Sequence, residues 1–165
     1  MNLADLAGLA GLADLADPAA TVHAGERLAA LVRGGDAIAL VGDLGAGKTT
    51  LVTGLVAALG GGAAAGPTFS LVNEYPGGRL VVWHVDLYRI ERAAELVELG
   101  LDDVIGDSRG ICVIEWADRF AVLPEDHLQI ELVHAGGGGR TLTASGTGPR
   151  GRELAAELLG SWPGA

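Results

Sequence analysis

The chain has 165 residues, of which 49% are hydrophobic, and its formal net charge at pH 7 is −10. This length and composition are typical of one globular domain with its own hydrophobic core. Only 11 Lys and Arg residues stand against 21 Asp and Glu residues. The charge therefore argues against a protein that binds nucleic acid by itself, because neutralising phosphates requires clustered basic side chains.

The N-terminal residues, MNLADLAGLAGLADLADPAA, are of low complexity. They lack the basic start of a signal peptide, and their apolar runs are too short to span a bilayer, so we expect a cytoplasmic protein. We interpret residues 1–17 as a loose helix or a disordered extension. We expect the folded domain to cover residues 18–160, with a tail over residues 161–165. Thr21 is a candidate N-cap for a helix over residues 22–33.

Residues 41–50, VGDLGAGKTT, match the pattern G-x-x-x-x-G-K-[ST]. Glycines let a backbone wrap around an anion, and the N–H groups then form a binding nest at a helix N-terminus. Lys48 would reach the β- and γ-phosphates of a nucleotide, and the Thr49 hydroxyl would ligate Mg²⁺. An apolar run precedes the motif and helical spacing follows it, in the order that a phosphate site requires. The predicted nucleotide-binding residues are Gly42, Asp43, Leu44, Gly45, Ala46, Gly47, Lys48, Thr49 and Thr50.

The remaining patterns predict an alternation of strands and helices. Apolar or alternating runs indicate strands over residues 69–75, 80–85 and 110–115, with a short helix over 92–99 between the last two. Two alternating segments flank four glycines and predict a hairpin over residues 127–133 and 140–145, before a helix over 152–159. We therefore predict an α/β, three-layer, P-loop NTPase-like fold with a mostly parallel sheet and an antiparallel edge hairpin. Cys112 lies within an apolar run and is expected to be a buried core residue.

Two acids are candidates for the second protein ligand of a nucleotide-bound Mg²⁺. Asp86 ends one apolar strand and Glu115 ends another, and open α/β sheets bind ligands where such strands emerge. Spacing alone does not rank the two. His84 stands two residues before Asp86 on the same strand face. Its two candidate roles are sensing phosphate and packing, and we favour packing because isolated histidines are often structural. The histidines and the cysteine show no spacing typical of structural zinc.

Four motifs taken together resemble one family. They are GDLGAGKTT (42–50), PTFSLVNEY (67–75), HVDLYR (84–89) and EWADR (115–119). In this order the chain is similar to the bacterial TsaE family, small ATPases required for threonylcarbamoyl-adenosine formation at position 37 of tRNA. The phosphate loop is generic, whereas the combination of the other three motifs is specific to this family. The resemblance extends over residues 18–150.

The resemblance implies ATP as the nucleotide and a P-loop fold with a mixed sheet. It implies that Thr49 and Glu115 ligate Mg²⁺ and that Asp86 supports hydrolysis near the γ-phosphate. The implied catalytic residues are Lys48, Asp86 and Glu115. Pro67, Thr68 and Phe69 would form a switch, Thr21 and Arg140 would contact the nucleotide, and Trp116 is similar to a family tryptophan near the site. The chain departs from the family pattern at Gly66, where a serine is usual, and at Ala117, where a proline is usual.

The resemblance also implies partners: a TsaD-like transferase and a TsaB-like scaffold protein, which would hold the tRNA. No arginine is clearly placed to stabilise the transferring phosphoryl group, although Arg79, Arg89, Arg92 and Arg119 are possible. We therefore predict slow hydrolysis by the chain alone and faster hydrolysis with partners. Two alternatives are a nucleotide-gated binding module with incidental hydrolysis and a small-metabolite kinase. The kinase is disfavoured because we find no arginine-rich lid.

Overall fold

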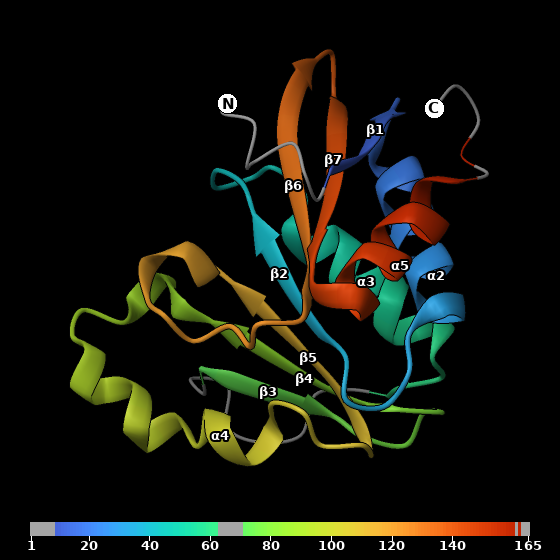
Figure 1. Ribbon diagram of the computed structural model, residues 1–165. Coiled ribbons are helices and arrows are strands. Elements are labelled where there is room, and N and C mark those ends of the chain that lie inside the picture. Colours follow the sequence, from blue (N-terminus) through green and yellow to red (C-terminus); the bar gives the residue numbers. More distant parts are fainter. Residues whose placement is uncertain (1–8, 63–70, 161, 163–165) are drawn as a thin grey trace.

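The computed structural model describes residues 9–62, 71–160 and 162. Its centre is a seven-stranded sheet in the order β1-β7-β6-β2-β5-β4-β3 (Figure 1). The strands are β1 (Leu9–Leu15), β2 (Ala37–Val41), β3 (Val72–Tyr75), β4 (Val81–Asp86), β5 (Gly110–Glu115), β6 (His127–Gly136) and β7 (Gly139–Thr147). Strands β4, β5, β2 and β6 pair in parallel, while β3, β7 and β1 join antiparallel. The predicted α/β fold, with parallel strands at its centre and an antiparallel hairpin towards one edge, is confirmed.

Three longer helices cover one face of the sheet, on the right of Figure 1. They are α2 (Pro18–Leu31), α3 (Lys48–Ala58) and α5 (Gly148–Gly160). The other face is covered by α4 (Leu101–Val104) and the 3₁₀ segments η1 (Leu87–Arg89), η2 (Ala93–Leu99) and η3 (Ala117–Arg119). No helix among the described residues is long and apolar enough to cross a membrane.

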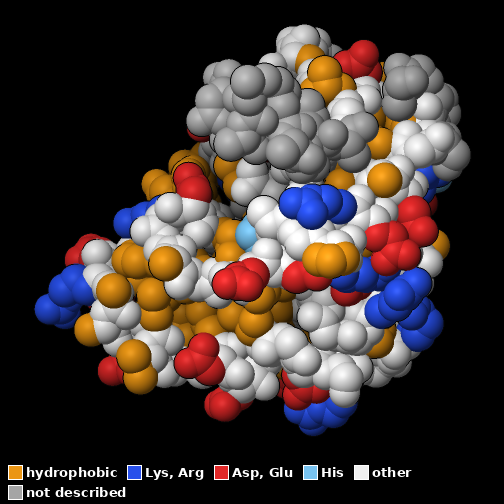
Figure 2. Space-filling view, in the orientation of Figure 1, with side chains coloured by type: hydrophobic (Ala, Val, Ile, Leu, Met, Phe, Trp, Pro, Cys, Tyr) orange, Lys and Arg blue, Asp and Glu red, His pale blue; other side chains and the backbone are white. Residues whose placement is uncertain are grey.

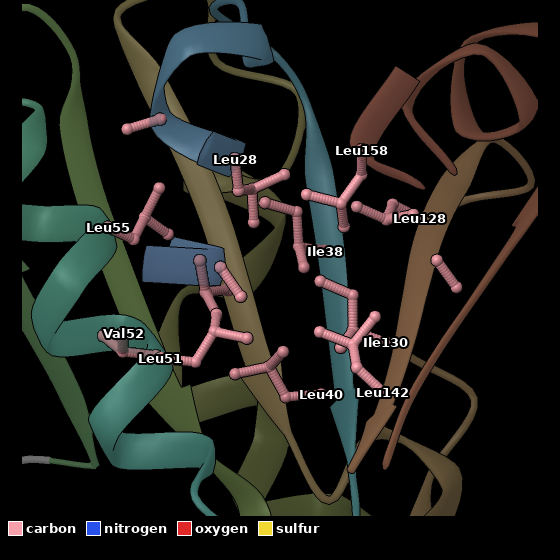
Figure 3. Close-up of a cluster of buried hydrophobic side chains, with 14 of the residues drawn as sticks. Leu28, Ile38, Leu40, Leu51, Val52, Leu55, Leu128, Ile130, Leu142 and Leu158 are labelled. Carbon is pink, nitrogen blue, oxygen red and sulfur yellow. The ribbon is translucent and has the colours of Figure 1, made fainter. Parts of the chain in front are cut away.

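The main core lies between the sheet and the three longer helices. In Figure 3, Leu51 and Leu55 of α3 point towards Ile38 and Leu40 of β2, and Leu28 of α2 lies above them. The other face of β2 is buried as well, because Ala39 belongs to a second cluster beneath the short helical segments. A central strand buried on both faces carries a continuous apolar run, which is why residues 37–41 were recognisable in the sequence.

The structure of residues 9–15 differs from our prediction of a loose helix or a disordered extension. Residues 9–15 form the edge strand β1, antiparallel to β7, so the fold begins before residue 18 and this segment is neither a helix nor a disordered extension. Its alternation places Leu15 in the core, with 1% of its surface exposed, and leaves Leu12 56% exposed. Helix α2 then begins at Pro18 with Asp17 as its N-cap, whose Oδ1 accepts from the Ala20 N–H at 2.8 Å.

The predicted cap and tail are therefore also revised. Thr21 is not the cap but a buried residue within the first turns of α2. Trp162, which we assigned to the tail, is only 9% exposed and packs against α2, with its ring centroid 5.2 Å from the guanidinium carbon of Arg27. Proline fixes the backbone geometry suited to the first turn of a helix, so the helix starts four residues earlier than a cap at Thr21 would have set it.

Candidate active site

The phosphate loop, residues 42–50, connects β2 to α3 as predicted. Gly47 is the N-cap of α3 with φ of +106°, a left-handed conformation that glycine adopts without strain. Gly42 approaches β6 so closely that a Cβ there would lie 2.5 Å from the Leu132 carbonyl oxygen. Both positions require glycine for reasons of backbone geometry, which is why the motif was readable from the sequence.

Lys48 is buried at the start of α3, with 6% of its surface exposed. Its Nζ donates to the carbonyl oxygen of Gly42 and, at 3.2 Å, to that of Asp43. The same ammonium lies 4.3 Å from the ring centroid of Trp116, within the range of a cation–π interaction. The Lys48 ammonium thus lies between two backbone carbonyls of the phosphate loop and the ring of Trp116.

A cleft of about 230 Å³ opens over the phosphate loop, and we call it the main cleft. It brings together residues that lie far apart in the sequence. Its lining consists of Pro18, Thr21, Leu44, Gly45, Ala46, Gly47, Lys48, Thr49, Thr50, Asp86, Glu115, Trp116, Gly138 and Arg140. Gly42 and Asp43 line instead an adjoining cavity of about 170 Å³, which also contacts Trp116.

The two candidate acids end neighbouring parallel strands, directly opposite each other in the register of β4 and β5. Asp86 caps η1, and its Oδ1 accepts from the Tyr88 N–H at 2.9 Å. Glu115 is only 4% exposed, yet it lines the main cleft. The structure therefore brings both acids to the same cleft as Thr49, at the carboxyl ends of the parallel strands.

His84 is not simply a packing residue, as we had interpreted it. Its Nε2 lies 2.8 Å from Oε2 of Glu115, and the imidazole N–H donates to the buried carboxylate. His84 is opposite Val113 in the β4–β5 register, so Glu115 is its diagonal neighbour on the same face. The sequence contains both residues, but only the strand register shows that they meet.

Thr21 and Arg140 both lie against the phosphate loop. Thr21 is 2% exposed, and a Cβ added to Gly47 would be 3.4 Å from its methyl carbon. Arg140 donates from Nε to the Ala46 carbonyl at 2.9 Å and from Nη2 to the Gly45 carbonyl at 3.0 Å. Contact between these two side chains and a nucleotide stays a prediction.

The donors around the main cleft suit a magnesium ion bound together with a nucleotide. Thr49, Asp86 and Glu115 offer only oxygen atoms, which Mg²⁺ prefers. Among the described residues, no group of three or more His, Cys, Asp or Glu side chains is arranged to hold a metal by itself. Mg²⁺ usually takes one or two protein ligands and completes its shell with waters and substrate phosphates, so this donor set fits it.

The comparisons with known proteins agree with the motifs. The model of the family "Threonylcarbamoyl adenosine biosynthesis protein TsaE" matches residues 15–142. The chain belongs to the TsaE family. The tRNA threonylcarbamoyladenosine biosynthesis protein TsaE of Bacillus subtilis is 38% identical over 143 residues, covering 86% of this chain and 89% of that protein. The TsaE protein of Streptomyces coelicolor is 40% identical over 135 residues, which are 76% of this chain and 90% of that protein.

A solved structure extends the match to three dimensions. The crystal structure of B. subtilis YdiB superposes with a TM-score of 0.75 at 34% identity, covering 90% of this chain and 93% of that one. The resemblance to the TsaE family inferred from four short motifs is thus confirmed over most of the described fold.

The remaining predicted residues have different outcomes. The predicted switch residues Pro67, Thr68 and Phe69 lie outside the described residues, as does Gly66. Arg79 donates to the Ala29 carbonyl at 2.6 Å, and Arg119 donates to the Leu87 carbonyl at 3.1 Å. Among the arginines that the structure describes, only Arg140 lines the main cleft.

Proposed function

We propose that this chain is a Mg²⁺-dependent ATPase that acts in tRNA threonylcarbamoyladenosine formation. The observation that carries the proposal is the meeting of Lys48, Thr49, Asp86 and Glu115 in one cleft above a phosphate loop. The TsaE relatives are named for tRNA threonylcarbamoyladenosine biosynthesis, which supports the pathway. The generic phosphate loop supports a nucleoside triphosphate as substrate.

In the proposed reaction, water attacks the γ-phosphorus of ATP, the bond to the β–γ bridging oxygen breaks, and ADP and phosphate form. The N–H groups of the phosphate loop bind the phosphates, and Lys48 moves from the Gly42 and Asp43 carbonyls to the β- and γ-phosphates. Thr49 and Glu115 would hold Mg²⁺, which when bound offsets charge on the phosphates. Asp86 orients the attacking water, and the hydrogen bond from His84 keeps the Glu115 carboxylate in place.

We infer that partner proteins supply the charge that stabilises the transferring phosphoryl group. Arg140 is the only described arginine lining the main cleft, and its Nε and Nη2 are engaged by the loop, so hydrolysis by the chain alone should be slow. A TsaD-like transferase and a TsaB-like scaffold would accelerate it. Figure 2 shows Lys and Arg side chains scattered over the visible face, which supports tRNA being held by the partners rather than by this chain.

The same shortage of arginine in the cleft favours a second candidate function, a binding module gated by the nucleotide. In that case ATP binding would assemble the partner complex and hydrolysis would be incidental. The two functions differ in whether tRNA modification needs the chemical step. Variants that bind ATP but do not hydrolyse it therefore separate them.

The test is ATP turnover by the purified chain, first alone and then with the TsaB-like and TsaD-like proteins. We expect a slow rate of hydrolysis that rises with the partners. The rate should fall about 100-fold or more in Lys48→Ala, because the ammonium that stabilises the negative charge on the phosphates is lost. Glu98→Gln, an exposed acid on η2, is the matched control and should leave the rate unchanged.

Glu115→Gln and Asp86→Asn complete the experiment. We expect both variants to bind ATP in calorimetry, to lose turnover and to lose tRNA modification in the reconstituted system. Modification that persists without turnover would establish the binding module instead. Turnover that ignores the partners but responds to a small phosphoryl acceptor would contradict both proposals and favour a kinase.

A further inference from the structure

Arg140 is anchored at the end of the hairpin nearest the phosphate loop. It stands near the start of β7, and its backbone lies between two ladder partners, His134 of β6 and Leu15 of β1. Its side chain is partly buried and reaches the lining of the main cleft. Strand pairing on both sides fixes the Arg140 backbone. The sheet therefore sets how far the side chain reaches towards the phosphate loop.

All three guanidinium nitrogens of Arg140 donate to backbone carbonyls. Nε donates to Ala46 at 2.9 Å, Nη2 donates to Gly45 at 3.0 Å, and Nη1 donates to Gly139 at 2.8 Å. The first two bonds join β7 to the phosphate loop across more than ninety residues of sequence. A guanidinium presents its donors in a rigid planar fork, so two adjacent carbonyls held by it are fixed relative to each other.

These bonds determine which way the loop peptides face. The described peptides are all trans, so the Ala46 carbonyl and the Gly47 N–H of one peptide point in opposite directions. With the carbonyl turned towards Arg140, that N–H is turned away from it. The preceding peptide is held from both sides, because its Gly45 carbonyl accepts from Arg140 and its Ala46 N–H donates to the Asp43 carbonyl at 3.0 Å.

We propose that Arg140 is a positioning residue that sets the phosphate loop in its anion-binding form before any nucleotide arrives. Free carbonyl dipoles at the cleft would repel phosphate oxygens, and the Arg140 guanidinium, which itself lines the cleft, offsets the Gly45 and Ala46 dipoles and fixes the peptides that carry them. The inference rests on the proposed function only in taking phosphates as the ligand. Because the loop contacts phosphates and not the base, the effect is the same for any nucleoside di- or triphosphate.

The first experiment uses the nucleotide-free protein. Hydrogen exchange of the backbone N–H groups of residues 43–47 is compared in wild type, Arg140→Gln and Arg152→Gln, the last an exposed arginine on α5. We expect exchange at Ala46 to quicken about tenfold in Arg140→Gln, since hydrogen bonds from a charged donor are lost. The Arg152 variant should match wild type. Unchanged exchange in Arg140→Gln would overturn the proposal.

The second experiment measures the affinities of ATP, ADP and inorganic tripolyphosphate by calorimetry. In Arg140→Gln we expect all three to weaken by a common factor of about ten, and Arg140→Lys to recover part of the loss because one donor can still reach the loop. A loss for ATP and ADP without a loss for tripolyphosphate would assign Arg140 to the base or ribose, and would overturn the proposal. Thermal unfolding of both variants identifies any that are not folded.

The two experiments also separate this inference from the proposed function. If the wild-type chain binds no ATP, the proposed function fails, yet the exchange of the loop N–H groups in the nucleotide-free protein still decides the role of Arg140. If wild type binds ATP and the exchange is unaffected in Arg140→Gln, the positioning role fails while the ATPase proposal stands.

Discussion

Cys112 illustrates how far burial alone alters the chemistry of one side chain. It lies within β5 with 1% of its surface exposed, and burial raises the pKa of its thiol from 9.0 to about 12. The folded thiol therefore stays protonated at pH values where the unfolded thiol has ionised. Because the folded pKa is the higher one, the stability linked to this group is fully present below about pH 9 and is lost as the pH rises towards 12.

We predict that native protein at pH 8 resists alkylation by iodoacetamide. The thiolate fraction of Cys112 should be lower by ~1000-fold than in the unfolded chain, because the pKa differs by three units. Mass spectrometry with and without denaturant checks this. Rapid labelling of the native protein would contradict the burial, and Cys112→Ala supplies the unlabelled control.

At the scale of elements, α2 and α3 cross so closely that two glycines meet the opposite backbone. A Cβ on Gly25 of α2 would lie 2.1 Å from the Leu51 carbonyl oxygen, and one on Gly54 of α3 would lie 2.2 Å from that of Val22. Glycine is a poor helix former, so its presence at both positions reflects this contact rather than local preference. The crossing positions the helix that begins at the phosphate loop.

We predict that Gly54→Ala destabilises the fold by about 2 kcal/mol, because backbone atoms at the crossing cannot yield to the added methyl group. Helix propensity alone would have stabilised this variant by ~1 kcal/mol. The matched control is Gly160→Ala at the end of α5, where an added Cβ would meet no atom of the described residues within 4 Å and little change is expected. Urea denaturation measures both, and a stabilised Gly54→Ala would disprove the close crossing.

At the scale of the whole molecule, β1 extends the sheet by one strand and completes one end of the core. Leu15 and Ala13 are buried in the main cluster, while Leu12 faces away from it. Strand β1 also pairs with β7 at Arg140, so the N-terminal segment supports the hairpin that reaches the phosphate loop. Residues 9–15, which we interpreted as part of a loose helix or a disordered extension, therefore belong to the framework of the site.

We predict that Leu15→Ala lowers the free energy of unfolding by about 3 kcal/mol, as expected for a large core side chain. On the same strand, Leu12→Ala should change it by less than ~0.5 kcal/mol, because Leu12 is largely exposed. Chemical denaturation compares the two variants directly. Equal and small effects would show that β1 does not belong to the cooperative fold.

The phosphate loop, strand β5 and the hairpin could be predicted because each is encoded by adjacent residues. Local backbone geometry requires glycine at positions 42 and 47, and burial explains the apolar strand before them. The acids Asp86 and Glu115 were identified as strand-end residues by the same local reasoning. Four short motifs were sufficient to place the chain in the TsaE family, and the family match confirms that placement.

Only the tertiary structure decided the contacts between segments that are distant in the chain. The bond from His84 to Glu115 depends on the register of two strands, and the bonds from Arg140 to Gly45 and Ala46 cross more than ninety residues. Strand β1 was missed because an edge strand owes its stability to its partner rather than to its own composition. The residues of the main cleft are therefore readable in sequence, while the contacts that hold them in place follow from packing.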